Sequence, residues 1–425
     1  MCSSDLRSIR TGDLFVALSG KNFDGHRFVE DAIRKGAIGA IFSQRPMLNT
    51  HGKRVMVRVK DTTRALQQIA AYHRSLINIP VIAVTGSNGK TTVKDMISAV
   101  LTQGYSVLKT EGTKNNHIGV PQTLLKLNST HQICVIELGT NHRGEIRLLG
   151  DIARPTVAVI TNIGPSHLEF LQDLEGVFTE KMDILKTLDK DMGAAIVNGD
   201  DPYLVRVPRA SRRVFTYGLG DSNDIYAVKV RGAEKNISFT VNGSQKFEVG
   251  LIGTHNVYNA LAAVATGTLF GVSYKDIRKA LSGFRAANMR LAPVRVRGID
   301  VINDSYNSNP LSMSAAIEAL VNYPASSRWI VTGDMLELGK KAVLFHRKAG
   351  EEIARAGAGG LLTLGELSKF TLSQARASGL SRNKSWHCAS HGEAAAILKS
   401  HVKRGDVILI KGSRAMTMEK ILEKL

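Results

Sequence analysis

Short runs of apolar residues recur along the chain, separated by longer stretches that mix apolar and polar positions. The run at residues 81–84 is continuously apolar, as in parallel strands that are covered on both faces. Similar runs stand at 133–138, 157–160 and 194–197, with helix-length segments between them. This alternation predicts a doubly wound α/β sheet in the middle of the chain.

The same alternation of strand-like and helix-like segments is present on both sides of this middle part. Before Pro80 the pattern predicts strands at 13–18, 37–42 and 55–59. It also predicts a short helix at 28–35 and a second helix that runs through Tyr72. Short alternating segments at 213–251 predict antiparallel strands, and a helix follows at 256–270. The last part, predicted to be Rossmann-like, has strand patterns at 301–303, 329–332, 361–364 and 407–410. We therefore predict three domains, at residues 1–79, 80–290 and 291–425.

Length and composition agree with this organisation. At about 150 residues per domain, 425 residues correspond to about three domains, and 43% hydrophobic residues can supply a core to each. No apolar run approaches the roughly 18 residues of a membrane-spanning helix, and the start lacks a signal-peptide pattern. Three cysteines are too few for a disulfide framework or a zinc cluster. We expect a soluble, cytoplasmic protein that does not insert into a membrane.

The net charge is strongly positive, at +19, with a sequence pI of about 9.9. Such a balance raises the question of nucleic-acid binding. The excess is spread over all three predicted domains and forms no basic tail. This distribution favours attraction of small anionic substrates, and we expect no nucleic-acid partner.

A glycine-rich segment follows the run at 81–84 and opens a predicted helix. It reads Thr85-Gly86-Ser87-Asn88-Gly89-Lys90-Thr91-Thr92. Small residues let backbone N–H groups approach a phosphate at a helix N-terminus. In this interpretation Lys90 reaches the terminal phosphates and Thr91 holds Mg²⁺ through its hydroxyl. The alternative is a strand-to-helix turn that contains this sequence by chance.

With further motifs, the chain resembles the Mur ligases, ATP-dependent enzymes that extend the peptide of peptidoglycan precursors. The motifs lie at residues 85–92, 115–121, 137–141, 144–146, 304–310, 333–339 and 411–414. The resemblance implies ATP and Mg²⁺ as cofactors. It also implies UDP-N-acetylmuramoyl-tripeptide and D-alanyl-D-alanine as substrates, because the 304–310 motif matches that branch and the Asp-Asn-Pro-Arg sequence of the tripeptide-forming branch is absent.

The resemblance implies a metal and catalytic group at the carboxyl edge of the sheet. Glu137 ends one apolar run and His167 follows another, and the family places metal ligands at both positions. Lys181 corresponds to a lysine whose amine is carbamylated by CO₂ and whose carbamate helps to hold Mg²⁺. The alternatives are a solvated strand end for Glu137, a packing histidine for His167 and a surface lysine like Lys186 for Lys181.

The resemblance also implies residues around the nucleotide. His255, Asn256 and Asn259 match a segment near the adenine, although Asn256 would serve equally as a helix cap. Arg290 resembles an arginine that contacts ATP phosphates. Asp304 resembles an acceptor of the ribose hydroxyls. ATP would then bind the central domain, and catalysis would require domain closure.

Substrate residues are implied less specifically. Asn115, Asn116 and His117 resemble the segment that faces the UDP-muramoyl peptide, and Asn141 belongs to a neighbouring polar loop. On the D-alanyl-D-alanine side stand Tyr306, Asn307 and Asn309. A turn rich in Asn, Ser and Pro would look the same for structural reasons.

The start of the chain departs from the family pattern. The family carries an Asp-Ser-Arg motif that touches the uridine, whereas here only Arg7 and Ser8 onward match, with Thr11 in place of a proline. We hypothesise that residues 1–6 are not native, because they can be back-translated as the end of a sequencing adapter read from a GTG start. Resequencing the locus tests this. A truncated first domain would lack an edge strand and bind uridine weakly.

These features lead to one expectation and two rivals. We expect a monomeric, three-domain ligase that joins D-alanyl-D-alanine to UDP-N-acetylmuramoyl-tripeptide through an acyl phosphate. The nearest rival is another amino-acid-adding ligase of the superfamily, of the tripeptide-forming or folylpolyglutamate type. The rival from another class is a cationic nucleotide-binding protein that contacts RNA.

Overall fold

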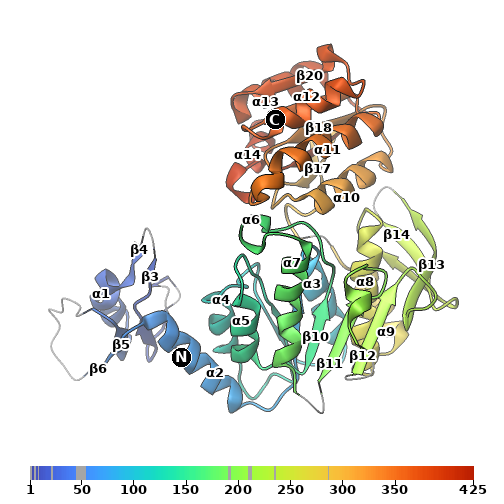
Figure 1. Ribbon diagram of the computed structural model, residues 1–425. Helices are drawn as coiled ribbons and strands as arrows, with labels where there is room; N and C mark the ends of the chain where they lie inside the picture. The colour runs from blue at the N-terminus through green and yellow to red at the C-terminus, as the bar shows by residue number, and fades with distance from the viewer. Residues whose placement is uncertain are drawn as a thin grey trace.

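The computed structural model describes residues 2–3, 6–7, 9–20, 23–44, 54–189, 193–208, 213–233, 236–285 and 287–425. Figure 1 shows three lobes that follow one another along the chain, in blue, in green to yellow, and in orange to red. We name them the first, central and third domains. Their sheets fall within the three predicted segments, and the exact boundaries at 79/80 and 290/291 stay a prediction.

The first domain contains a small parallel sheet, with the order β1-β2-β5-β6 in the described residues. Its strands are β1 (Cys2–Ser3), β2 (Leu14–Val16), β5 (Gly39–Phe42) and β6 (Val55–Arg58). A hairpin of β3 (Ser19–Gly20) and β4 (Phe23–Asp24) precedes the helices η1 (Gly25–Phe28), α1 (Val29–Arg34) and α2 (Thr62–Ser75). The three strands and two helices predicted from the sequence are confirmed.

A two-residue strand stands at the edge where a truncated first domain was expected to lack one. Cys2 pairs with Leu14 and Ser3 with Phe15, so β1 covers the outer edge of β2. The physical reason is that an exposed strand edge offers unpaired N–H and C=O groups, which even a two-residue segment can satisfy.

The central domain is built on a long sheet, nine-stranded in the described part of the chain, with the order β15-β14-β13-β12-β11-β10-β7-β9-β8. The strands are β7 (Val81–Thr85), β8 (Val107–Lys109), β9 (Ile133–Glu137), β10 (Val157–Ile160), β11 (Ala194–Asn198), β12 (Arg213–Gly218), β13 (Ile225–Gly232), β14 (Ile237–Val241) and β15 (Gln245–Val249). Strands β8 to β12 with β7 are parallel, which confirms the prediction for the middle of the chain.

The prediction of antiparallel strands throughout 213–251 was wrong for β12. This strand is parallel to both β11 and β13, and the antiparallel pairs are β13 with β14 and β14 with β15. The cause is the connection after Asn198, which includes η3 (Leu204–Arg206) and carries the chain back along the sheet before β12 begins.

Helices cover both faces of this sheet. Because successive strand residues point to opposite faces, Ile82 and Val84 pack in one cluster while Val81 and Ala83 pack in another. One face carries α3 (Lys90–Leu101), α8 (His255–Leu269) and α9 (Tyr274–Ser282); the other carries α4 (Gly119–Leu124), α5 (Glu145–Ala153), α7 (Leu174–Met182) and η2 (Asp183–Thr187). The short helix α6 (Leu168–Leu171) lies beside α7. The predicted helix at 256–270 is confirmed as α8.

The third domain has a six-stranded sheet in the described residues, with the order β16-β17-β21-β18-β19-β20. Its strands are β16 (Ala292–Val296), β17 (Ile299–Asp304), β18 (Arg328–Thr332), β19 (Gly360–Leu364), β20 (Ser385–Cys388) and β21 (Val407–Lys411). The helices are α10 (Pro310–Val321), η4 (Gly339–Lys341), α11 (Ala342–Arg355), α12 (Ser368–Ala377), η5 (Arg382–Lys384), α13 (His391–His401), η6 (Arg414–Met416) and α14 (Glu419–Leu422). Only β16 runs antiparallel to its neighbour, so the domain is α/β as predicted.

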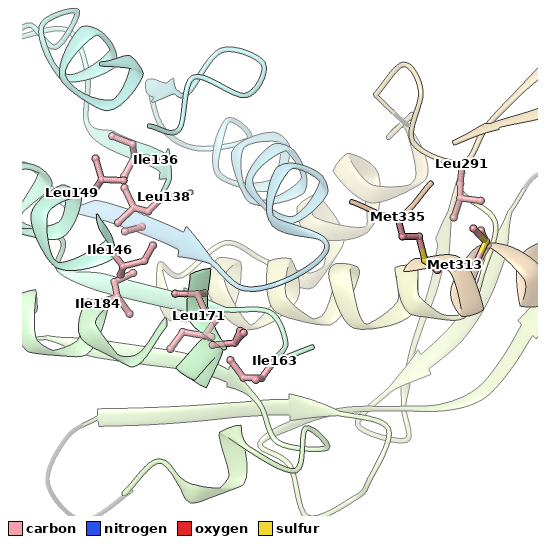
Figure 2. Close-up of a cluster of buried hydrophobic side chains, with 14 of the residues drawn as sticks. Ile136, Leu138, Ile146, Leu149, Ile163, Leu171, Ile184, Leu291, Met313 and Met335 are labelled. Carbon is pink, nitrogen blue, oxygen red and sulfur yellow. The ribbon is translucent and has the colours of Figure 1, made fainter. Parts of the chain in front are cut away.

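One apolar cluster continues from the central into the third domain. Figure 2 shows Ile136, Leu138, Ile146 and Leu149 on the central side of this cluster. It also shows Leu291, Met313 and Met335 grouped on the side of the third domain. Both groups are almost completely buried.

None of the helices in the described ranges combines the length and the apolar character that crossing a membrane requires.

Candidate active site

The glycine-rich segment forms a tight loop between β7 and α3, at the carboxyl end of the parallel sheet. Gly86 has a φ of +140° and Gly89 a φ of +80°, values that favour glycine. A Cβ at Gly86 would lie 2.0 Å from the Thr161 hydroxyl oxygen, and one at Gly89 would lie 2.5 Å from Asn259 Oδ1. The loop is therefore held closely between β10 and α8, with its N–H groups at the start of α3.

Lys90 lies at the mouth of this loop. Its ammonium group donates hydrogen bonds to the carbonyl oxygens of Gly86 at 2.8 Å and Ser87 at 3.1 Å. Burial lowers the pKa of Lys90 to about 8, and the carboxylate of Glu137 opposes this shift. A phosphate bound at the loop would bring further negative charge and favour the ammonium form. The position fits a lysine that binds phosphate.

Glu137 ends β9 with one carboxylate oxygen free. Asn115 Nδ2 donates to Glu137 Oε1 at 2.7 Å. Glu137 Oε2 is buried and has no hydrogen-bond partner among the described residues, although the residue, at 1% exposure, lines the cavity described below. A buried carboxylate oxygen without a partner is costly. A bound cation would remove that cost.

The other predicted ligands allow the fit of Mg²⁺ to be tested. Thr91 is buried at the start of α3, and His167 lines the same cavity as Glu137. The described ranges hold no group of three or more His, Cys, Asp or Glu side chains that could cage a metal. Mg²⁺ does not need such a cage, because it is commonly bound by one or two carboxylates together with substrate phosphates and water. The residues present fit that mode of binding.

Lys181 is deeply buried near the end of α7, with 1% of its surface exposed. Burial lowers the pKa of Lys181 well below its usual value, the positive charge of Lys90 lowers it further, and Glu180 and Glu145 act in the opposite direction. Burial therefore makes the charged form less favourable here than it is for an exposed lysine. Among the described residues, Lys181 is not one of those that line the cavity.

The start of α8 presents polar side chains to the cavity. Asn256 Nδ2 donates to the Ile252 carbonyl at 2.7 Å, and Asn259 Nδ2 donates to Asn256 Oδ1 at 2.8 Å. His255 Nδ1 is buried and has no hydrogen-bond partner in the described part of the chain. Burial, with Lys411 as a second cause, lowers the pKa of His255 to about 4. A neutral imidazole with an unsatisfied nitrogen can form a hydrogen bond to a ligand such as adenine, whose ring nitrogens accept hydrogen bonds and whose amino group donates them.

The third domain contributes a charged group opposite α8. Asp304, at the end of β17, accepts hydrogen bonds from Lys411 Nζ at 2.6 Å and from the Leu291 N–H at 3.1 Å. The guanidinium carbon of Arg290 lies 4.1 Å from the centre of the Tyr306 ring, at cation–π distance. Both carboxylate oxygens of Asp304 keep lone pairs that can accept further hydrogen bonds.

Two asparagines join the phosphate loop to the third domain. Asn88 Nδ2 donates to Asn309 Oδ1 at 3.1 Å, and Asn309 Nδ2 donates to Asn88 Oδ1 at 2.8 Å. Asn309 also caps α10, because its Oδ1 accepts the Ser312 N–H at 2.9 Å. The turn interpretation of this motif is therefore supported for Asn309, which in addition touches the loop.

One cavity of about 1150 Å³ brings most of the predicted residues together. Its lining includes Ser87, Asn88, Gly89, Lys90, Thr91, Thr92, Asn115, Glu137, Asn141, His167, His255, Asn256, Asn259, Arg290, Asp304, Tyr306, Asn307 and Asn309. Parallel sheets commonly bind ligands at this edge. Residues of the central and third domains thus line this cavity together.

A few predicted residues lie elsewhere. Gly86 belongs to the phosphate loop but is not among the residues that line the cavity, and it lies against Thr161. Asn116 and His117 are exposed outside the cavity, where Asn116 Oδ1 accepts the Gly119 N–H and the His117 carbonyl accepts from Gln67 of the first domain. Arg7 is exposed in the first domain. Ser8 lies outside the described residues.

The sequence motifs contain three cavity residues to which the sequence analysis gave no role. Lys411 is buried beside Asp304. Asn162 holds the loop, since its Oδ1 accepts the Asn88 N–H at 2.9 Å. Glu337 contacts His167 across the domain interface at 2.5 Å. The available signal for Lys411 and Glu337 was membership of the motifs at 411–414 and 333–339, and for Asn162 it was a position just after the apolar run at 157–160.

A phosphate loop at the edge of a parallel sheet, a carboxylate with a free buried oxygen and a facing third domain together define a nucleotide-dependent enzyme of the P-loop class. Three family models place it more narrowly. They are the Mur ligase family catalytic domain at residues 2–74, the Mur ligase middle domain at 84–267 and the Mur ligase glutamate ligase domain at 289–414. The chain belongs to the Mur ligase family and is an ATP-dependent amide ligase.

Individual relatives cover the whole chain. It is 39% identical over 428 residues to a Bacillus subtilis protein named UDP-N-acetylmuramoyl-tripeptide–D-alanyl-D-alanine ligase, covering 100% of this chain and 92% of that one. The structure of MurF from Acinetobacter baumannii matches with a TM-score of 0.89 and 32% identity, over 100% of this chain and 92% of that chain. MurF from Thermotoga maritima in complex with ADP matches with a TM-score of 0.87 and 28% identity, over 100% and 96%.

Proposed function

We propose that this chain joins D-alanyl-D-alanine to UDP-N-acetylmuramoyl-tripeptide, with conversion of ATP to ADP and phosphate. The observation that carries the proposal is the cavity of about 1150 Å³ in which the phosphate loop, the carboxylate of Glu137 and the Asn-rich turn of the third domain meet. The full-length similarity to a relative named for this reaction supports the choice of substrates.

In the proposed first step, the tripeptide carboxylate attacks the γ-phosphate of ATP and gives an acyl phosphate and ADP. The loop N–H groups, Lys90 and Arg290 would hold the phosphates and offset the repulsion between two anions. Thr91, Glu137 and His167 would hold Mg²⁺, which supplies further neutralisation of phosphate charge when bound. His255, Asn256 and Asn259 would contact the adenine, and Asp304 the ribose.

Lys181 is proposed to act as a carbamate. Its burial favours the neutral amine, which is the form that adds to CO₂ with release of a proton. The product carries a negative charge where an ammonium would repel the cations of the site. This change would add a carboxylate-like oxygen to Thr91, Glu137 and His167 as protein ligands of Mg²⁺.

In the proposed second step, the amine of D-alanyl-D-alanine attacks the acyl phosphate, and the tetrahedral intermediate collapses to the amide and phosphate. Tyr306, Asn307 and Asn309 would face the dipeptide, while Asn115 and Asn141, with Asn116, His117, Arg7 and Ser8 farther out, would face the UDP-linked substrate. Closure of the third domain would exclude water from the acyl phosphate. We also propose that the enzyme is a cytoplasmic monomer without nucleic-acid partners.

Amine-dependent phosphate release tests the proposal. The purified chain is incubated with MgATP and UDP-muramoyl-tripeptide that carries either diaminopimelate or lysine as its third residue. Phosphate is expected only after D-alanyl-D-alanine is added, and Lys90→Ala should abolish it. Release that requires a single amino acid instead would indicate a tripeptide-forming or folylpolyglutamate-type ligase. Stimulation by RNA, or no release at all, would contradict the proposal.

A further inference from the structure

A carboxylate from the third domain meets the proposed metal ligand His167 of the central domain. Glu337 Oε2 lies 2.5 Å from His167 Nδ1, although 170 positions separate the two residues. His167 immediately precedes α6, and Glu337 lies in the loop between β18 and η4. Both residues line the cavity.

The backbone around both residues is arranged for this contact. His167 has a φ of 53° and Glu337 a φ of 62°, in the left-handed region that side chains other than glycine seldom adopt. The Glu169 N–H donates to the Glu337 carbonyl at 3.1 Å. A Cβ at Gly339 would lie 3.2 Å from Glu169 Cα. Strained backbone held by neighbouring contacts is common at functional sites.

The contact has a chemical consequence for the imidazole. An ionised carboxylate only accepts hydrogen bonds, so His167 must carry its proton on Nδ1. In the neutral ring, Nε2 then keeps its lone pair. Histidines that bind metals almost always donate their other ring N–H to a carboxylate or carbonyl group, which fixes the tautomer and the ring orientation. Glu337 is placed to do this from another domain.

We propose that Glu337 is a positioning residue that holds His167 in the Nδ1–H tautomer when the third domain meets the central domain, and thereby completes the metal-binding group. The inference rests on the proposed function only for the identity of the metal. It links domain closure to metal affinity: an enzyme whose domains are apart would lack this orientation of His167. The alternative is a structural ion pair, which at 41% side-chain exposure of Glu337 would contribute little.

The tautomer can be observed directly by NMR of the full chain labelled with ¹⁵N-histidine, with a non-hydrolysable ATP analogue and Mg²⁺ added. The His167 signals are identified by their loss in His167→Gln. We expect an Nδ1–H ring in the wild type, and a mixture with the Nε2–H form in Glu337→Ala and Glu337→Gln. Glu169→Ala is the matched control, because it removes an exposed carboxylate from α6, two positions after His167, and leaves the contact between His167 and Glu337 intact.

Metal affinity gives a second readout without catalysis. Free Mn²⁺ is measured by EPR during titration of the same protein and ATP analogue. We expect about 10- to 100-fold weaker Mn²⁺ binding in both Glu337 variants and no change in Glu169→Ala. The isosteric Gln variant keeps the test valid if the Ala variant does not fold.

Two outcomes would overturn the inference. One is an unchanged tautomer with unchanged Mn²⁺ affinity in Glu337→Gln; the other is a change in domain closure, seen by small-angle scattering, with no change in tautomer. Neither readout needs ligation, so a chain that fails the phosphate-release assay could still confirm the role of Glu337, and an active chain could still refute it.

Discussion

At the scale of single residues, the buried amine of Lys181 offers a direct test of the proposed mechanism. Lys181→Ala should remove the proposed carbamate and lower kcat by about a hundredfold or more. A short carboxylic acid such as acetate should restore part of this activity, because it can occupy the space of the carbamate. The measurement is amine-dependent phosphate release with increasing acetate.

The control for this prediction is Lys186→Ala. Lys186 is a neighbouring lysine that is exposed and paired with Asp183 at 2.6 Å. It should keep full activity and show no response to acetate. Near-normal turnover in Lys181→Ala would refute the role of Lys181.

A second residue-scale prediction concerns pH. His255 has a folded-state pKa of about 4, whereas a histidine in an unfolded chain titrates near 6.5. Between these values the unfolded chain binds a proton that the folded chain does not. The free energy of unfolding of the nucleotide-free protein should therefore fall as the pH decreases from 6.5 to 4, by at most about 3 kcal/mol from this residue.

His255→Gln should flatten this dependence, and urea unfolding followed at pH 7, 6 and 5 measures it. A variant at His255 with the full wild-type slope would show that other groups cause the loss of stability at low pH.

At the scale of secondary-structure elements, α10 depends on a residue with two roles. Asn309 caps this helix and forms the amide pair with Asn88. Asn309→Ala should lose both and destabilise the protein by about 1 kcal/mol through the cap. Asn309→Ser should keep the cap, because serine is a good N-cap residue, but its shorter side chain cannot form the amide pair.

Comparing these two variants separates the roles. The midpoint temperature of thermal unfolding should be lower than that of the wild type for Asn309→Ala and close to it for Asn309→Ser. Small-angle scattering with an ATP analogue should show a smaller compaction than wild type in both. Equal stability of the two variants would contradict the capping role, and wild-type compaction in the Ser variant would contradict the role of the amide pair.

The elements also show what the sequence could and could not predict. Continuous apolar runs such as that of β7 predict parallel strands because burial on both faces leaves no polar positions. The direction of β12 was not predictable in this way, since the same alternation fits a parallel or an antiparallel neighbour. The phosphate loop was identified because all its residues are adjacent in sequence.

Contacts between domains could not be predicted from the local pattern of apolar and polar residues. Glu337 stands in the motif at 333–339, but its partner His167 belongs to another domain and follows a strand of a different sheet. Asn309 was predicted to face a substrate, whereas the structure also pairs it with Asn88, 221 positions away. Such pairs depend on how folded domains meet, which hydrophobic periodicity does not specify.

At the scale of the whole molecule, the net charge of +19 should act on association rates. UDP-N-acetylmuramoyl-tripeptide carries several negative charges, while D-alanyl-D-alanine is a zwitterion without net charge. Raising the salt concentration shortens the range of the electrostatic field of the protein.

With ATP saturating, kcat/KM for the UDP-linked substrate should therefore fall, by roughly tenfold between 0.02 and 0.5 M KCl. The value for the dipeptide, measured in the same assay, should change much less. Equal salt dependence for both substrates would mean that salt acts on the enzyme itself, and that the positive surface has no part in attracting the anionic substrate.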